Sequence, residues 1–192
     1  MSEPRTVVSG VNFTESLPLP VLTLMHKEMI NKSASVNQNL SLRPSESADK
    51  TFLETVYAET RRSELAIFNW SLEQENAFFK MQFSLQNKAY EMQFPDADYT
   101  VVELKKMPIG CLIVERAGEI KLVNIALLPE FRSRGIGTFL LRQLQDEAKA
   151  AGKPLILHVL KTNERAINLY QRHGFAIDGS DELHLAMRWQ IL

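Results

Sequence analysis

Apolar and polar residues follow regular patterns only from Asn39 onward. Residues 1–38 are rich in Ser, Thr, Asn and Pro and hold no sustained period. We therefore expect an N-terminal arm at residues 1–38 and one domain at residues 39–192. Two interpretations of the arm are open: a mobile segment, or a segment that docks on a partner subunit or over an active site.

Helical spacing of apolar residues recurs four times within the domain. The first predicted helix carries a face made of Phe52, Leu53, Val56, Tyr57 and Thr60. Ser71 and Gln74 have the spacing of a capping box, so a second, long helix is expected to run to about Met92. Large apolar residues spread around its axis, and we therefore expect much of this helix to be covered. Two further helices are expected, one ending at Ala151 and one over residues 163–173.

Seven segments have the apolar patterns of strands. They are residues 40–43, 99–104, 109–115, 120–128, 155–160, 175–177 and 183–189. Three of them follow one another through tight turns, which is typical of an antiparallel meander. With the helices they give the order β-α-α-β-β-β-α-β-α-β-β. This order predicts an α/β (α+β) domain with a mixed, mostly antiparallel sheet flanked by helices.

The composition indicates a cellular compartment and argues against some classes of partner. Hydrophobic residues make up 45% of the 192 residues and charged residues 23%, which is the balance of a soluble globular chain. The net charge of −1 argues against a nucleic-acid partner. Neither an export signal nor an apolar run of the ~20 residues that span a bilayer is recognised, so no membrane partner is expected. The single cysteine, Cys111, favours a reducing, cytoplasmic location and argues against a metal site.

The segment Arg132-Ser133-Arg134-Gly135-Ile136-Gly137-Thr138 follows a predicted strand and opens a predicted helix. Unpaired N–H groups at a helix N-terminus attract anions, and glycines let the backbone approach phosphate oxygens. Arg132 and Arg134 add positive charge and bidentate donors. Residues 131–172 hold eight Lys or Arg and three Asp or Glu, a balance of +5. The segment therefore predicts a site for a small polyanion; an ordinary solvated helix start is the alternative.

Two motifs occur in order along the second half of the domain. The first is Arg-x-x-Gly-x-Gly at Arg132, Gly135 and Gly137. The second is Asn-x-x-Ala-x-x-Leu-Tyr-x-x-x-Gly-Phe, formed by Asn163, Ala166, Leu169, Tyr170, Gly174 and Phe175. Together they resemble the signature of the GNAT superfamily of N-acetyltransferases, over about residues 39–192. A dinucleotide fingerprint would need a third glycine, where Leu140 stands.

The resemblance implies an enzyme that moves an acetyl group from the co-substrate acetyl-CoA to a primary amine of a small molecule or peptide. It implies that the coenzyme A pyrophosphate lies on residues 132–138. It also implies that pantetheine pairs with the backbone of Ala126 and Leu127, where two central strands splay apart. Asn163 is expected to hold the pantetheine or the helix start. A non-catalytic module that senses acyl-CoA is the alternative, and a homodimer is left open.

Catalytic candidates follow from the same resemblance. Tyr170 falls at the family's Tyr position and is the candidate acid that returns a proton to sulfur, besides packing in the core. His158, in a buried strand, is the candidate base, where related ribosomal-protein alanine acetyltransferases carry Glu. A water chain and Glu119 are alternatives. Cys111 is interpreted as a core residue and not a nucleophile. Trp70 is interpreted either as a wall of the acceptor pocket or as plain packing.

Overall fold

The computed structural model of the chain describes residues 39–62, 65 and 68–190, and the predicted arm lies outside them. The described part forms seven strands, β1 (Leu40–Pro44), β2 (Asp98–Leu104), β3 (Met107–Glu115), β4 (Ile120–Leu127), β5 (Leu155–Leu160), β6 (Ala176–Ser180) and β7 (His184–Trp189). Its α-helices are α2 (Lys50–Arg61), α3 (Leu72–Gln93), α4 (Ile136–Ala151) and α5 (Glu164–Arg172). Two 3-10 turns, η1 (Ser47–Asp49) and η4 (Pro129–Phe131), precede α2 and α4.

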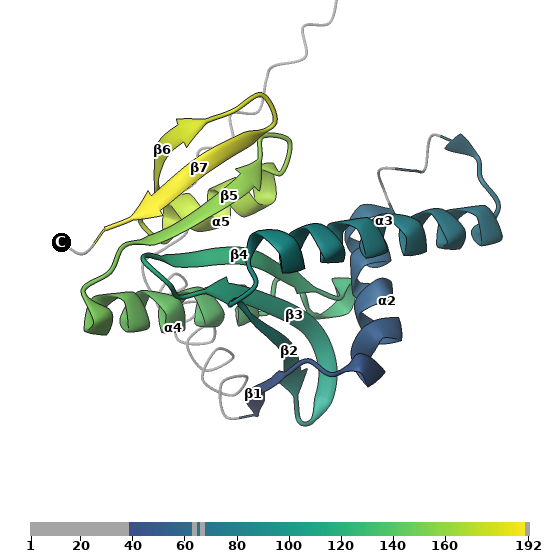
Figure 1. Ribbon diagram of the computed structural model, residues 1–192, viewed down its shortest axis with the longest axis horizontal. Helices are drawn as coiled ribbons and strands as arrows, with labels where there is room; N and C mark the ends of the chain where they lie inside the picture. Colours follow the sequence, from purple (N-terminus) through teal and green to yellow (C-terminus); the bar gives the residue numbers. More distant parts are fainter. Residues whose placement is uncertain (1–38, 63–64, 66–67, 191–192) are drawn as a thin grey trace, which may run out of the picture.

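The strands form one sheet in the order β1-β2-β3-β4-β5-β7-β6. Every neighbouring pair is antiparallel except β4 and β5, which are parallel. The strands β2, β3 and β4 form the predicted meander, and β5, β7 and β6 continue the sheet beyond it (Figure 1). The predicted element order and the mixed, mostly antiparallel sheet are therefore confirmed.

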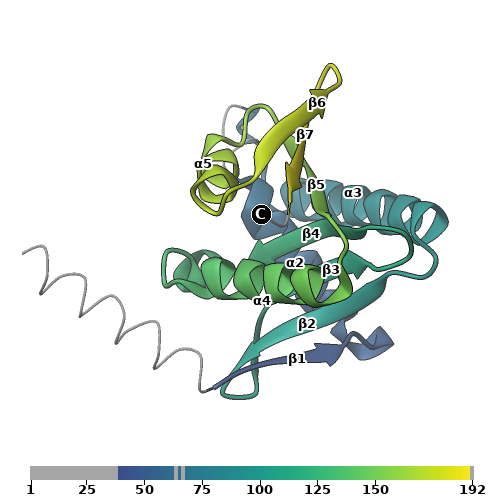
Figure 2. The same ribbon diagram turned by 90° about the vertical axis from the view of Figure 1, so that its left-hand side faces the viewer.

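Helices cover both faces of the sheet because successive strand side chains point to opposite sides. On β3, Leu112 and Val114 are buried in one cluster with Leu140 of α4. Cys111 and Ile113 face the other side, where α2 lies over β3 and β4. Figure 2 shows α4 on one side of these strands and α2 and α3 on the other. Each fully buried leucine of this core contributes roughly 1.5–3 kcal/mol.

The long helix α3 begins at the predicted capping box. The Ser71 hydroxyl accepts from the backbone N–H of Gln74 at 3.2 Å, and the Gln74 side-chain carbonyl accepts from the Ser71 N–H at 2.9 Å. The expectation that much of α3 is covered is wrong for the described residues. Met81, Leu85 and Met92 have 51%, 57% and 85% of their surfaces exposed. The helix extends past the sheet (Figure 1), and its one buried residue, Phe79, packs in a cluster with Ala58 of α2 and Leu65.

The central strands β4 and β5 separate after three residues. Parallel pairing joins Ile120–Leu122 to Leu155–Leu157 and goes no further. On the other side of β4, Leu122 pairs with Val114 and Asn124 with Ile113, so one extra residue forms a bulge between Leu122 and Asn124. A bulge bends its strand and increases the local twist. This bulge turns the rest of β4 away from β5 and confirms the expected splay.

Candidate functional site

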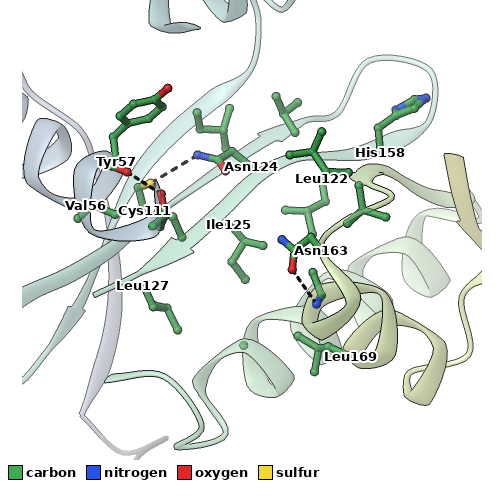
Figure 3. A pocket seen from close by; sticks show the side chains of 18 of the residues that line it. Val56, Tyr57, Cys111, Leu122, Asn124, Ile125, Leu127, His158, Asn163 and Leu169 are labelled. Carbon is green, nitrogen blue, oxygen red and sulfur yellow. Dashed lines mark hydrogen bonds between the residues drawn. The ribbon is translucent and has the colours of Figure 1, made fainter. Parts of the chain in front are cut away.

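One continuous cavity of about 930 Å³ follows β4 through the gap in the sheet. The turn before α4 and the first residues of α5 line one end, and α2, α3, β2 and β3 line the other. Figure 3 shows Ile125 and Leu127 of β4 on one side of the open space and Asn163 and Leu169 on the other. The splayed strands therefore join the predicted anion site to a separate chamber under α2 and α3.

The backbone of β4 offers a donor to this gap. The N–H of Leu128 donates to the Ile109 carbonyl of β3 at 2.9 Å. Because successive residues of a strand direct their N–H groups to opposite sides, the Leu127 N–H points away from β3, into the space that β5 leaves. A single N–H held in a strand is a preorganised donor for an oxygen atom bound there.

The turn before α4 has the backbone of an anion site. Gly135 caps α4 with a φ of 82°, and Ser133 has a φ of 58°. No side chain makes a cap hydrogen bond at the start of α4, so its first N–H groups are available to a ligand. Gly137 has room for a Cβ, since the nearest atom would be Leu169 Cδ2 at 3.5 Å.

Eight of the ten residues expected to hold the co-substrate line the cavity: Ala126, Leu127, Arg132, Ser133, Gly135, Gly137, Thr138 and Asn163. The other two do not. Ile136 is buried in the core with 1% of its surface exposed. The Arg134 guanidinium lies 5.4 Å from the centre of the Phe131 ring. Stacking on that ring holds Arg134 at the surface beside the turn.

Arg132 supports the site's architecture. Its Nε donates to the Leu127 carbonyl at 2.8 Å, and its Nη2 donates to the Glu59 carbonyl of α2 at 3.3 Å. The guanidinium thereby ties the end of β4 to α2. Partial burial, together with the charge of Arg165, lowers the pKa of Arg132. Arg132 also lines the cavity, so its expected contact with the co-substrate stays a prediction beside this bracing role.

Arg165 supplies positive charge that the sequence motifs did not indicate. Its Nη2 donates to the Ser133 hydroxyl at 2.9 Å, and this hydrogen bond joins the first turn of α5 to the turn before α4. Arg165 and Arg172 both line the cavity. Only their positions on α5, two and nine residues after the Asn163 cap, could have suggested them. Asn163 itself caps α5, since its Oδ1 accepts from the Ala166 N–H at 3.1 Å.

Tyr170 lies where a buried acid is expected. Its side chain lines the cavity, packs on Phe175 at 5.7 Å between ring centres, and has 6% of its surface exposed. Burial raises the pKa of Tyr170 to about 12. The hydroxyl therefore keeps its proton at neutral pH and can donate it. The core interpretation is confirmed, and the acid role is compatible with it.

The two candidate bases differ in position. His158 lines the cavity but is exposed, because Leu157 and Val159 take the buried face of β5. The expectation that His158 is buried is therefore wrong. Figure 3 shows its ring directed away from Asn163. Glu119 does not line the cavity, and its carboxylate accepts from Arg188 Nη1 at 2.7 Å.

Cys111 and Trp70 both have packing roles. Cys111 is 9% exposed, and burial raises the pKa of its thiol to about 12, so the thiol stays protonated. Its sulfur accepts from Asn124 Nδ2 at 3.7 Å. This confirms the core interpretation. Trp70 packs on Phe68 and Phe78, with ring centres 5.4 and 5.1 Å away, and is not among the cavity residues. Packing is therefore its role.

The charge of the cavity is positive. Arg61, Arg132, Arg165 and Arg172 line it, and no Asp or Glu is among its described lining residues. Within the described residues, no group of three or more His, Cys, Asp or Glu side chains could hold a metal ion. None of the helices over the same residues has the length and apolar character of a membrane span.

Comparison with known proteins gives partial sequence matches and close matches of fold. A segment of 58 residues of this chain is 45% identical to part of the [ribosomal protein bS18]-alanine N-acetyltransferase of Salmonella typhimurium. That segment covers 30% of this chain and 39% of the relative, so the chain matches less than half of that protein.

Two solved structures share the fold. The PaiA N-acetyltransferase from Thermoplasma acidophilum, in complex with coenzyme A, superposes with a TM-score of 0.61 at 22% identity, over 79% of this chain and 99% of that one. A GNAT family acetyltransferase from Elizabethkingia anophelis with acetyl-CoA bound gives a TM-score of 0.54 at 15% identity, over 80% and 99%. The family model for the acetyltransferase (GNAT) family matches residues 56–175, which is more than half of the chain. This match shows that the chain belongs to the GNAT acetyltransferase family.

Proposed function

We propose that this protein is an N-acetyltransferase that binds acetyl-CoA along the gap between β4 and β5 and acetylates a primary amine. The observation that carries the proposal is the continuity of the cavity. One space of about 930 Å³ joins the turn before α4, the Leu127 N–H, Tyr170 and a chamber under α2 and α3. Each part of a long, phosphate-bearing thioester and of an amine acceptor has a place in it.

The anionic end of acetyl-CoA fits the turn at residues 133–138. The N–H groups at the start of α4 and the Arg165 guanidinium offer donors to the pyrophosphate. The open edge of β4 beyond Leu122 offers backbone groups to the amides of pantetheine, as an added strand would. Two structural neighbours are complexes with coenzyme A or acetyl-CoA, which supports acetyl-CoA as the ligand.

In acetyl-CoA the acetyl group is bonded to the sulfur of coenzyme A, and the thiolate is a good leaving group. The Leu127 N–H is directed at the gap and can donate to the acyl oxygen. The Tyr170 hydroxyl, kept neutral by burial, can donate a proton to the sulfur that leaves. For the amine proton, we propose His158 through water, because it lines the cavity and none of the described lining residues carries a carboxylate.

Titration with acetyl-CoA tests the binding site. We expect the wild-type chain to bind acetyl-CoA in calorimetry and not to bind NADH. Arg165→Glu places a carboxylate beside Ser133 and should weaken acetyl-CoA affinity at least about tenfold. Arg142→Glu makes the same charge change on an exposed residue of α4 outside the cavity and should bind like wild type.

Turnover separates an enzyme from a sensor. Wild-type protein should release the thiol of coenzyme A only when both acetyl-CoA and a primary amine are present. Binding of acetyl-CoA without thiol release for any amine would favour the non-catalytic alternative. Equal affinity in Arg165→Glu and wild type would contradict the placement of the pyrophosphate.

A further inference from the structure

His173 lies next to the candidate anion site, just behind the wall of the cavity. It caps the C-terminal end of α5, where its backbone N–H donates to the Leu169 and Tyr170 carbonyls at 3.2 and 3.0 Å. Its own carbonyl accepts from Gln145 Nε2 of α4 at 2.6 Å. These hydrogen bonds hold the backbone of His173 against α4. The residue is half-buried and is not among the described residues that line the cavity.

The imidazole of His173 contacts a residue that does line the cavity. Its Nε2 lies 3.2 Å from Oγ1 of Thr138, the third residue of α4. Thr138 lines the cavity at the helix start where the pyrophosphate is proposed to bind. Gln145 follows Thr138 on α4 after about two helical turns. One face of α4 therefore holds both the backbone and the ring of His173.

The direction of this hydrogen bond decides what Thr138 can offer to an anion. A threonine hydroxyl has one proton to donate and two lone pairs that accept. If Nε2 of His173 carries a proton and donates it, the Thr138 oxygen accepts there and keeps its own proton for a phosphate oxygen. If Nε2 accepts instead, the hydroxyl proton is used up and only lone pairs face the anion. An anion bound at this helix start therefore favours the form with a proton on Nε2.

The charges around the ring make both arrangements accessible. Burial, together with the positive charges of Arg142 on α4 and Arg172 on α5, lowers the pKa of His173 below its ordinary value. The ring of the free protein is therefore neutral at neutral pH. A neutral imidazole carries one N–H, and the groups that face its two nitrogens determine which of them holds the proton.

We propose that His173 is a positioning residue for the co-substrate: its Nε2–H donates to Thr138 Oγ1 and thereby directs the Thr138 hydroxyl proton at the pyrophosphate of acetyl-CoA. This inference rests on the proposed N-acetyltransferase function and adds a residue to its co-substrate site. The ligand contacts Thr138, and His173 acts only through that hydroxyl. Because His173 caps the helix that carries Tyr170, the same contact also joins the anion site to the element of the proposed acid.

A double-mutant cycle, measured by calorimetry with acetyl-CoA, tests this link without an acceptor amine. Thr138→Val removes the hydroxyl and should weaken acetyl-CoA affinity about 10- to 30-fold. His173→Leu removes the donor behind it and should weaken affinity about 3- to 10-fold. In the Thr138→Val background, His173→Leu should change affinity by less than about twofold, because the group that transmits its effect is already gone.

Two further variants separate positioning from packing. His173→Gln keeps an N–H close to the position of Nε2 and should hold affinity within about threefold of wild type. Thr55→Val makes the same change as Thr138→Val on α2, at an exposed residue outside the cavity whose hydroxyl donates to the Thr51 carbonyl at 3.0 Å. It should bind acetyl-CoA like wild type. Thermal unfolding of each variant verifies that it is folded.

The protonated nitrogen of His173 can also be identified in the wild-type protein, so this test does not depend on the stability of any variant. Nitrogen NMR distinguishes the two ring nitrogens, and the His173 signals are assigned by their absence in His173→Gln. We expect the acetyl-CoA complex to hold a proton on Nε2, with or without a second proton on Nδ1. A proton on Nδ1 alone in the complex would overturn the proposal.

The outcomes distinguish this inference from the proposed function. Absence of acetyl-CoA binding by the wild-type protein overturns the proposed function. Where acetyl-CoA binds, wild-type affinity in Thr138→Val or His173→Leu, or additive losses in the double variant, overturns the positioning role alone. Affinity in His173→Gln as low as in His173→Leu overturns it as well, because loss of packing then explains the effect.

Discussion

Tyr170 has a packing role in the core and a proposed catalytic role as the acid. Its ring packs in the core beside Phe175, and the residue also lines the cavity. Replacement by phenylalanine keeps the packing and removes only the donor. We expect Tyr170→Phe to lower kcat about 10²-fold and to leave acetyl-CoA affinity within about threefold. Steady-state kinetics together with calorimetry measure both quantities, and an unchanged kcat would remove Tyr170 from the mechanism.

The pH dependence of this step has a defined sign. With a pKa of about 12, the Tyr170 hydroxyl is protonated at neutral pH and stays so up to about pH 10. Activity should therefore rise with pH as the acceptor amine loses its proton, without a fall assigned to Tyr170 below about pH 10. A falling limb between pH 7 and 9 that disappears in Tyr170→Phe would contradict this pKa.

Tyr99 has a buried hydroxyl whose hydrogen bonding affects stability. Its hydroxyl oxygen is buried and makes no hydrogen bond in the described part of the chain. A buried polar atom without a partner costs about 1–3 kcal/mol, so Tyr99→Phe should leave the free energy of unfolding unchanged or raise it. The neighbouring Thr100→Val is the control, because the Thr100 hydroxyl donates to the Leu112 carbonyl at 2.8 Å. Loss of this hydrogen bond should lower the free energy of unfolding in denaturant by about 1 kcal/mol. A larger decrease in Tyr99→Phe would show that the Tyr99 hydroxyl has a hydrogen-bond partner.

The bulged strand β4 is the element on which the site depends. Gly110 of β3 lets β4 approach closely at the point where the cavity begins. A Cβ at Gly110 would lie 2.2 Å from the Ala126 carbonyl oxygen and 2.7 Å from Leu127 Cδ2. Contacts this short require the strand to shift. The close approach of β3 and β4 thus sets the position of the Leu127 N–H.

Gly110→Ala should therefore lower both stability and binding. We expect a loss of roughly 1–3 kcal/mol in the free energy of unfolding and weaker acetyl-CoA binding. Gly179→Ala in the edge strand β6 is the matched control, since its Cβ would only meet Ala186 Cβ at 3.8 Å and should change stability by about 0.5 kcal/mol or less. Equal behaviour of the two variants in thermal unfolding and calorimetry would show that β4 tolerates displacement.

At the level of elements, the sequence predicts much of the fold. Hydrophobic periods and helix caps are local features of the sequence. The capping box of Ser71 and Gln74 therefore predicts the start of α3, and the apolar pattern that ends at Ala151 predicts α4. The burial of α3 could not be predicted, because coverage depends on which elements pack against a helix. The bulge between Leu122 and Asn124 also has no local signature, and only the resemblance to a family indicated the splay.

The candidate site was predictable where backbone geometry determines it. The turn at residues 132–138 needs glycine and a helix start, and both are visible in the sequence. The partners of its arginines were not visible. Arg132 braces Leu127 and Glu59, and Arg165 comes from another helix to reach Ser133. Such contacts arise from tertiary packing.

For the whole molecule, charge distribution matters more than net charge. The chain has a net charge of −1, yet the cavity holds four arginines and no carboxylate among its described lining residues. Acetyl-CoA carries several phosphate charges, so salt should screen part of its binding. We expect affinity to fall roughly fivefold between low and high salt, with a shallower dependence in Arg165→Glu. Salt-independent affinity in calorimetry would show that the arginines do not face the phosphates.

The central claim is that acetyl transfer takes place where β4 and β5 separate. A crystal structure with a non-transferable acetyl-CoA analogue, in which a methylene group replaces the thioester sulfur, tests it most directly. We expect the pyrophosphate on residues 133–138, pantetheine along β4 beyond Leu122, and the acyl oxygen within hydrogen-bonding distance of the Leu127 N–H. An analogue bound elsewhere, or an acyl group remote from both Leu127 and Tyr170, would contradict it.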